Sequence, residues 1–128
     1  ANDDIQSLAQ DLYSNDVEQV ALELGRLSNY SDGWDGPRSH PADKDSFILV
    51  RKFFNLIKNS NILSQIEPTI FSVGTAALDI ETERARMLLE FGPQGTIYAN
   101  IDIDEKELDL EIDGFSGEYL PKELRPFF

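Results

Sequence analysis

Hydrophobic residues near the start of the chain recur every three or four positions, which is the spacing of one face of an α-helix. They form two runs, made up of Ile5, Leu8 and Leu12 and then of Val17, Val20, Leu24 and Leu27. Between the runs lies Ser14-Asn15-Asp16, where Asn15 and Glu18 have the spacing of a capping box. The pattern therefore predicts two helices in tandem, with one continuous helix as the alternative.

A polar stretch over residues 28–42 interrupts this pattern and predicts a loop, because it contains Gly33, Gly36, Pro37 and Pro41. Three residues that favour helix N-termini follow it, namely Asp43, Asp45 and Ser46. The helix expected after them carries an apolar stripe and ends near Asn59-Ser60-Asn61. Its stripe consists of Phe47, Val50, Phe54 and Ile57.

From Pro68 onward the hydrophobic period changes to two, which indicates strands. We expect strands over residues 69–73, 84–91, 96–103 and 107–113, with residues 77–80 as a candidate partner of the first. The turns between them are too short for crossover helices, so the strands should run antiparallel. The predicted fold is α+β, with two or three N-terminal helices packed on one face of a three- to five-stranded antiparallel meander sheet.

The length of 128 residues indicates a single domain. Its helical part is expected over about residues 3–66, its meander over about 68–113, and its tail over 114–128. The tail ends in Pro126-Phe127-Phe128, and we expect the two rings to dock on the domain or on a second subunit.

Composition adds a strong charge imbalance, with 24 Asp and Glu against 11 Lys and Arg and a formal net charge of -13. Such a charge repels nucleic acid and anionic membranes and attracts cationic partners. The absence of cysteine excludes disulfides and thiolate metal sites. No apolar run of membrane-spanning length and no signal-peptide pattern occurs in the sequence, so we expect a cytoplasmic protein.

The acids concentrate in the last two predicted strands. Alternation places Ile97, Ala99 and Ile101 toward the helices, and it places the polar residues between them on the outer face. If Ile103 pairs with Leu108, then three outward pairs follow. They are Asp102 with Asp109, Asn100 with Glu111, and Tyr98 with Asp113.

Opposed like charges are unfavourable in a sheet, and the preceding strand should relieve only part of this repulsion. We expect Arg86 to pair with Asp102 and Arg84 to lie near Asp104. Over residues 100–113 the chain has seven acids and one Lys. Outward residues on one strand stand about 6.8 Å apart, and a row of acids at that spacing resembles a row of phosphates.

Two other interpretations of these acids stay open. An outward strand face is ordinarily polar, so the acids can serve solubility or block edge-to-edge aggregation. Calcium binding is the other interpretation, but residues 102–106 lack the glycine and the ligand spacing of an EF-hand loop. We therefore expect no metal site and no cofactor.

The segment Ser31-Asp32-Gly33-Trp34-Asp35-Gly36-Pro37 surrounds the single tryptophan with turn-forming residues. Trp34 either anchors this loop in the core or forms a binding hot spot. Leu27-Ser28-Asn29-Tyr30 leads into Trp34-Asp35-Gly36, and a helix, Pro68 and a small meander follow. This order resembles uncharacterised small bacterial and phage proteins with a Trp-Asp-Gly turn between their helices. Those proteins usually have a Gly-rich turn and a second-strand Trp, where this chain has Gly74-Thr75-Ala76 and Phe91. The resemblance implies no catalytic residues.

Catalytic patterns are missing from the sequence. His40 is the only histidine and lies in the Pro-rich loop, and no serine with an adjacent base can be identified. Phosphate-binding, dinucleotide-binding and zinc-binding motifs are also absent. We therefore expect a protein that is not an enzyme.

The sequence predicts an acidic interaction protein that occupies the basic, nucleic-acid-binding surface of a partner protein. Such a protein would be an inhibitor, for example an antitoxin, an anti-defence factor of a phage or mobile element, or another DNA mimic. It would bind neither nucleic acid nor a membrane directly. The expected contact residues are Asp102, Asp104, Glu105, Glu107, Asp109, Glu111, Asp113, Trp34 and Asp35.

Two alternatives to this function stay open. The first is a structural or assembly module, with a homodimer as one form, in which Trp34, Tyr98 and Phe127-Phe128 make an apolar subunit contact. In that case the acids only confer solubility. The second is a small acidic enzyme or a cation-binding protein, and a deep pocket would favour it.

Overall fold

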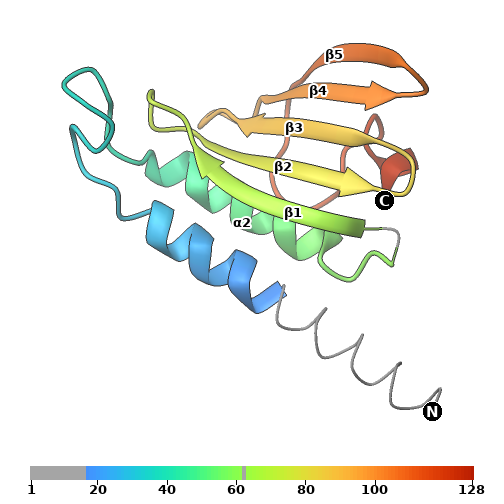
Figure 1. The fold of residues 1–128 in the computed structure, drawn as a ribbon, viewed down its shortest axis with the longest axis horizontal. Coiled ribbons are helices and arrows are strands. Elements are labelled where there is room, and N and C mark those ends of the chain that lie inside the picture. Colours follow the sequence, from blue (N-terminus) through green and yellow to red (C-terminus); the bar gives the residue numbers. More distant parts are fainter. Residues whose placement is uncertain (1–16, 62) are drawn as a thin grey trace.

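The computed structural model of the protein describes residues 17–61 and 63–128. The run from Ile5 to Leu12 and the proposed cap at Asn15 lie outside the described residues. Within the described part, two helices pack against a five-stranded antiparallel sheet, and a short 3-10 helix, η1 (Arg125–Phe127), lies near the end of the chain. The predicted α+β fold is therefore confirmed (Figure 1).

Both helices follow the sequence pattern. Residues 17–27 are helical, and the apolar positions Val20, Leu24 and Leu27 are buried. The second helix, α2 (Lys44–Ile57), is capped by Asp43, whose carboxylate accepts a hydrogen bond of 2.9 Å from the backbone N–H of Ser46. Its predicted stripe is buried together with two further residues, Ser46 and Phe53.

The five strands follow one another in space in the order in which they occur along the chain. Each of them pairs antiparallel with the next, because the turns between them are short. The strands are β1 (Leu63–Ile70), β2 (Ala76–Thr82), β3 (Arg86–Phe91), β4 (Ile97–Ile103) and β5 (Lys106–Ile112).

The first strand differs from the prediction. The sequence pattern placed it over residues 69–73 and extended the helical part to about residue 66, whereas β1 begins at Leu63. Pro68 lies inside this strand, opposite Leu78 of β2. Because β1 is at the edge of the sheet, it tolerates a residue without a ladder N–H. Residues 71–75 then form the turn, in which the N–H of Phe71 donates to the carbonyl of Thr75 (2.9 Å).

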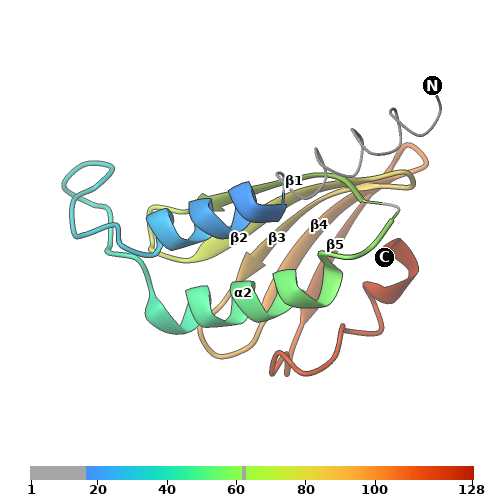
Figure 2. The ribbon, with the colours of Figure 1, turned by 90° about the horizontal axis from the view of Figure 1, so that it is seen from below.

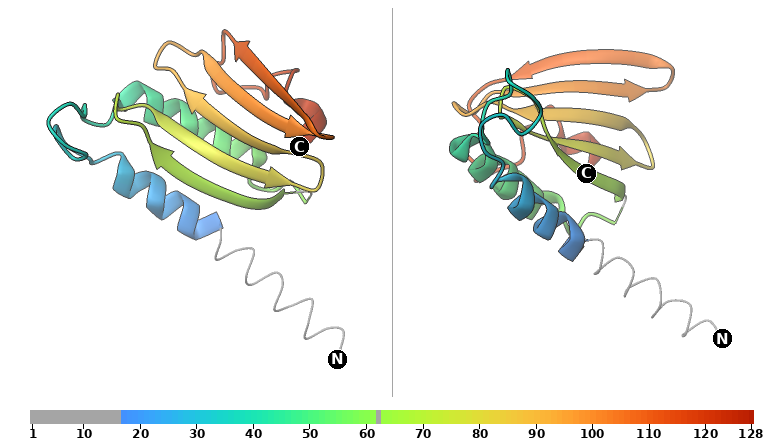
Figure 3. Two further views of the ribbon diagram at one scale, coloured as in Figure 1. Left: turned by 45° about the horizontal axis from the view of Figure 1, so that its top comes forward. Right: turned by 60° about the vertical axis from the view of Figure 1, so that its left-hand side comes forward.

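Within the described residues, the helices lie on one face of the sheet. Figure 2 shows the first helix, α2 and the C-terminal segment on the same side of the strands. The side chains on this covered face form the core, and most of them are fully buried. They include Leu78, Ile80, Met87, Leu89, Phe91, Ile97 and Ile101. Figure 3 shows the opposite, broad face of the sheet, and none of the helices in the described part of the chain lies over it.

The C-terminal tail packs on its own domain, which is one of the two arrangements that we expected. Phe127 is buried, and the ring of Phe128 lies edge-on to Phe53 with centroids 6.0 Å apart. Arg84, which we expected near Asp104, donates a hydrogen bond of 2.8 Å to the carbonyl of Pro126. The tail thus extends the helical layer, and the ring of Phe127 is not exposed to a second subunit.

One buried hydroxyl joins the start of α2 to the middle of the sheet. The Oγ of Ser46 donates to the carbonyl of Phe91 (2.5 Å) and accepts from the N–H of Ala76 (2.8 Å). Ser46 is fully buried, so no water can replace either bond without a change of structure. This side chain therefore holds α2 in place over β2 and β3.

The Ser46→Ala substitution should lower the free energy of unfolding by about 1–3 kcal/mol, because it leaves a buried N–H and a buried carbonyl without a partner. Urea denaturation followed by circular dichroism measures the change. The matched control is Ser116→Ala at an exposed position, which should change the stability by less than about 0.5 kcal/mol. Equal effects of the two substitutions would contradict the assigned role of Ser46.

Candidate functional site

The uncovered face of the sheet is strongly acidic. The strand registers place fifteen side chains outward, in three rows of five that cross all the strands. We call these fifteen positions the acidic face, because eight of them are carboxylates and one, Arg86, is a cation. The rows are Gln65, Glu81, Arg86, Asp102, Glu107; Glu67, Asp79, Leu88, Asn100, Asp109; and Thr69, Ala77, Glu90, Tyr98, Glu111.

The register of the last hairpin differs from the prediction by two residues. Ile103 pairs with Lys106 rather than with Leu108. The reason is a tight two-residue turn, in which Asp104 and Glu105 both have positive φ angles of 50° and 63°. This is the geometry of a type I′ turn, whose twist matches that of the flanking strands. Because the shift is an even number, every side chain keeps its predicted face.

The observed register changes which outward residues oppose one another. Asp102 lies opposite Glu107, Asn100 opposite Asp109, and Tyr98 opposite Glu111. The Nδ2 of Asn100 donates to Glu107 (2.7 Å) and to Asp109 (2.8 Å). One amide thus binds two carboxylates that are consecutive on the outer side of β5, which offsets part of their mutual repulsion.

Arg86 is the single cation among the fifteen positions, and it is bound to the sheet itself. In its row it lies between Glu81 and Asp102, and its place opposite Asp102 is the one predicted from the sequence. Its ion pair, however, is with Asp79, at 3.2 Å. The hydrogen bond with Asp79, together with the nearby charges of Glu81 and Asp102, raises the pKa of Arg86 above its ordinary value. The remaining carboxylates therefore give the face a large negative excess.

The structure brings most of the predicted acids together. Asp102, Glu107, Asp109 and Glu111 lie on the acidic face, and the exposed turn residues Asp104 and Glu105 extend it at one end. Asp113 follows β5, and its carboxylate accepts a hydrogen bond of 2.9 Å from the hydroxyl of Thr96.

Sequence reasoning missed the acids on the first three strands, which are Glu67, Asp79, Glu81 and Glu90. Glu67, Asp79 and Glu81 alternate with apolar residues, as do the acids of β5. This signal was available, but the first strand was predicted over residues 69–73 and its candidate partner over 77–80. Glu67 and Glu81 lie outside those ranges, whereas β1 and β2 include them.

An open, shallow depression of about 470 Å³ lies on the acidic face. Its apolar lining includes Phe71, Leu88 and Tyr98, and the side chains of Leu88 and Tyr98 are 38% and 48% exposed. The acids that line it are Glu90, Asp109 and Glu111. The depression thus combines exposed apolar and aromatic surface with negative charge.

The tryptophan loop lies outside the acidic face. Trp34 is half-buried, and its Nε1 donates to the carbonyl of His40 (2.7 Å) while its ring packs on Tyr30 with centroids 5.1 Å apart. Asp35 is exposed in the same loop, which Figure 1 shows beside the turn between β1 and β2. Trp34 therefore anchors its loop, and the structure does not join the two residues to the predicted acids.

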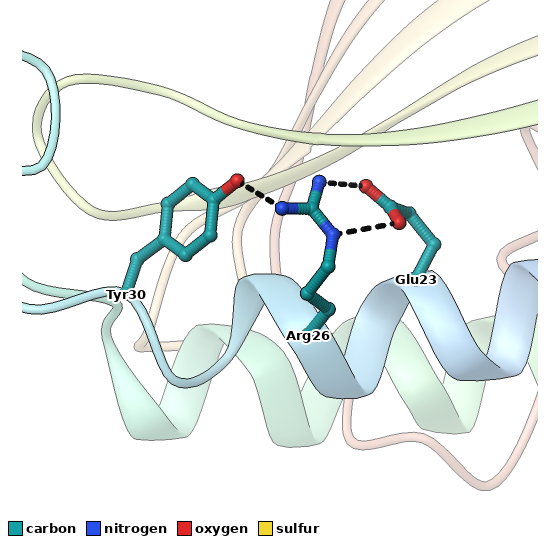
Figure 4. Close-up of polar contacts among 3 residues, drawn as sticks. All are labelled: Glu23, Arg26 and Tyr30. Atoms are coloured by element: carbon teal, nitrogen blue, oxygen red, sulfur yellow. Dashed lines mark hydrogen bonds and ion pairs between the residues drawn. The ribbon is translucent and has the colours of Figure 1, made fainter.

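A short polar chain connects the first helix to this loop (Figure 4). Arg26 forms an ion pair with Glu23 and donates a hydrogen bond of 2.6 Å to the hydroxyl of Tyr30. The hydrogen bond from Arg26 lowers the pKa of Glu23. Since Tyr30 also packs on Trp34, these contacts set the position of the loop relative to the helix.

Across residues 17–61 and 63–128, no group of three or more His, Cys, Asp or Glu side chains has an arrangement that could hold a metal ion. The same part of the chain has no helix that is both long enough and apolar enough to cross a membrane.

Comparisons with protein-family models, with curated proteins and with solved structures gave no match for this chain. The resemblance to small bacterial and phage proteins with a Trp-Asp-Gly turn stays a prediction. The argument for function therefore depends on the geometry and charge of the acidic face.

Gly74 holds the tryptophan loop against the sheet, because its φ is +92° and an added Cβ would lie 2.3 Å from the carbonyl oxygen of Pro41. The Gly74→Ala substitution should lower the free energy of unfolding by at least about 2 kcal/mol. Thermal and urea denaturation measure the loss. The control is Gly25→Ala, in a helix with open space around it, which should stabilise the protein by up to about 1 kcal/mol. A neutral Gly74→Ala variant would contradict the close approach.

Glu105 has a left-handed backbone conformation that disfavours residues with a side chain. The Glu105→Gly substitution should therefore raise the free energy of unfolding by about 1 kcal/mol. Glu111→Gly is the matched control, because it removes the same charge from a paired position within β5 and should lower the stability by about 0.5–1 kcal/mol. If both variants shift the urea midpoint in the same direction, the loss of negative charge and not the backbone conformation of the I′ turn explains the change in stability.

Proposed function

We propose that this protein is a non-enzymatic inhibitor that uses its acidic face to occupy the nucleic-acid-binding surface of a basic partner protein. The observation that carries the proposal is the eight carboxylates and one paired arginine on a sheet face that no helix of residues 17–61 and 63–128 covers. Antitoxins, anti-defence factors of phages or mobile elements, and other DNA mimics are the classes that such a surface fits.

The spacing of the carboxylates supports this proposal. Successive outward residues on one strand lie about 6.8 Å apart, and neighbouring strands lie about 4.8 Å apart. The outer side of β5 carries Glu107, Asp109 and Glu111 in succession, and Asp113 follows the strand. Proteins that bind nucleic acid contact phosphates with arrays of Lys and Arg. A regular row of carboxylates presents such an array with a comparable series of negative charges.

Hydrogen bonds on and beside the acidic face favour an organised surface over charge that serves solubility alone. Solubility needs charge but no fixed geometry, and ordinary surfaces mix both signs. Here Asn100 orients Glu107 and Asp109, and Thr96 orients Asp113. Side chains that are held before binding lose less conformational entropy when a partner docks. This favours a recognition role for the acids of β5.

The first prediction of this proposal concerns the partner and the effect of salt. The tagged protein should capture a nucleic-acid-binding protein from native lysate at low salt, and duplex DNA should displace that protein. The complex should dissociate at moderate salt, because exposed charges more than about 8 Å apart are screened at physiological ionic strength. A captured protein that resists both salt and DNA would contradict phosphate mimicry and would favour an apolar contact.

The matched variants are Asp109→Lys/Glu111→Lys on β5 and Glu18→Lys/Glu123→Lys, two exposed positions outside the acidic face. Both double variants change the net charge equally. The first should weaken binding of the captured partner by about a hundredfold, and the control by less than about threefold. Isothermal titration calorimetry with the purified partner measures both. Equal losses would mean that the total charge, and not the acidic face, determines binding.

A further inference from the structure

Tyr98 occupies a distinctive place within the acidic face. It lies between Glu90 of β3 and Glu111 of β5 in the third row, and its ring is 48% exposed. The hydroxyl of Thr75 donates a hydrogen bond of 2.6 Å to Glu90, which orients that carboxylate. An exposed aromatic ring thus lies between two carboxylates, next to the apolar surface of Leu88 and Phe71 in the depression.

No cation of the acidic face neutralises the two carboxylates beside Tyr98. The third row contains no cation, and Arg86 lies in the first row, two outward positions or about 14 Å away along the strand. Arg86 is also bound to Asp79. The depression is therefore complementary to a cation that comes from a partner.

Arginine fits this combination of groups better than lysine does. A guanidinium stacks on an aromatic ring and binds a carboxylate through two parallel hydrogen bonds, while its methylene stem covers apolar surface. A lysine ammonium is a more strongly hydrated point charge that cannot form the paired hydrogen bonds. Tyr98 supplies the ring, Glu90 and Glu111 supply the carboxylates, and Leu88 and Phe71 supply the apolar surface.

We propose that the depression around Tyr98 receives an arginine side chain of the basic partner protein. This inference rests on the proposed function, and it adds a preference for arginine over lysine at one place on the acidic face. Arginines that contact phosphate in the nucleic-acid complex of the partner would bind here instead.

The test uses two fluorescent nine-residue peptides that differ only in having three arginines or three lysines at the same positions. Fluorescence anisotropy at low salt should show about three- to fivefold tighter binding of the arginine peptide to the wild-type protein. Tyr98→Leu keeps the charge and the apolar character of the site, so it should remove this preference and leave binding of the lysine peptide unchanged. The control is Tyr119→Leu, at a 75% exposed position in the tail, which should keep the preference.

A second variant keeps the inference falsifiable if Tyr98→Leu does not fold, as judged by circular dichroism. Glu90→Gln removes one carboxylate beside the ring and should weaken the arginine peptide more than the lysine peptide. Spermine is the third probe, and spermine binding as tight as that of the arginine peptide would overturn the inference in favour of a small polycation.

The outcomes separate this inference from the proposed function. Equal affinity of the wild-type protein for both peptides overturns the arginine preference, even if a DNA-displaceable partner is found. A clear arginine preference that depends on Tyr98 supports the inference. If such a preference occurs without a DNA-displaceable partner, the arginine site stands and phosphate mimicry is wrong.

Discussion

The structure depends on a sheet that the described helices and the tail cover on one face. The first helix, α2 and the C-terminal tail all pack on that face, and the strand residues that point toward them are almost entirely apolar. Because alternate residues of a strand point to opposite sides, this arrangement places every second residue of five strands on the face opposite the helices. The covered face supplies the apolar burial that offsets the self-repulsion of a chain with a net charge of -13. The acidic face is possible because the other face is so well covered.

The two layers are joined at a few defined points rather than by apolar packing alone. Ser46 connects the start of α2 to Phe91 and Ala76 in the sheet. At the same end of the molecule, the N–H of Asp43 donates to the carbonyl of Gly74 (2.8 Å), and the N–H of His40 donates to that of Ser72 (2.7 Å). These bonds are directional, so they set the position of the helical layer relative to the strands. The acidic face therefore lies on a rigid support.

The acidic face combines repulsion with local order. Opposed acids such as Asp102 and Glu107 repel each other, and a strand register alone cannot relieve this. Asn100 and Arg86 reduce the repulsion in two places, but they also hold carboxylates in defined positions. A surface that needed charge only for solubility would gain nothing from such positions. The Tyr98 depression adds apolar and aromatic surface among these charges.

Local patterns in the sequence predicted much of this molecule correctly. The buried stripe of α2 and the outward side of β4 and β5 follow from periodicity, which acts over a few positions. The sequence offered three candidates for the cap of α2, and the structure selects Asp43 among them. The start of β1 and the place of Glu67 were not predicted, because Pro68 indicated a boundary where an edge strand in fact tolerates it. The hairpin register depended on a type I′ turn formed by two residues that are not glycine. Local preferences disfavour such a turn at these residues, and the pairing of β4 with β5 imposes it. The sequence by itself determined which residues are acidic and which side of β4 and β5 they occupy. Only the tertiary structure decided which carboxylates stand side by side, because neighbours across a sheet are set by pairing between strands that are distant along the chain.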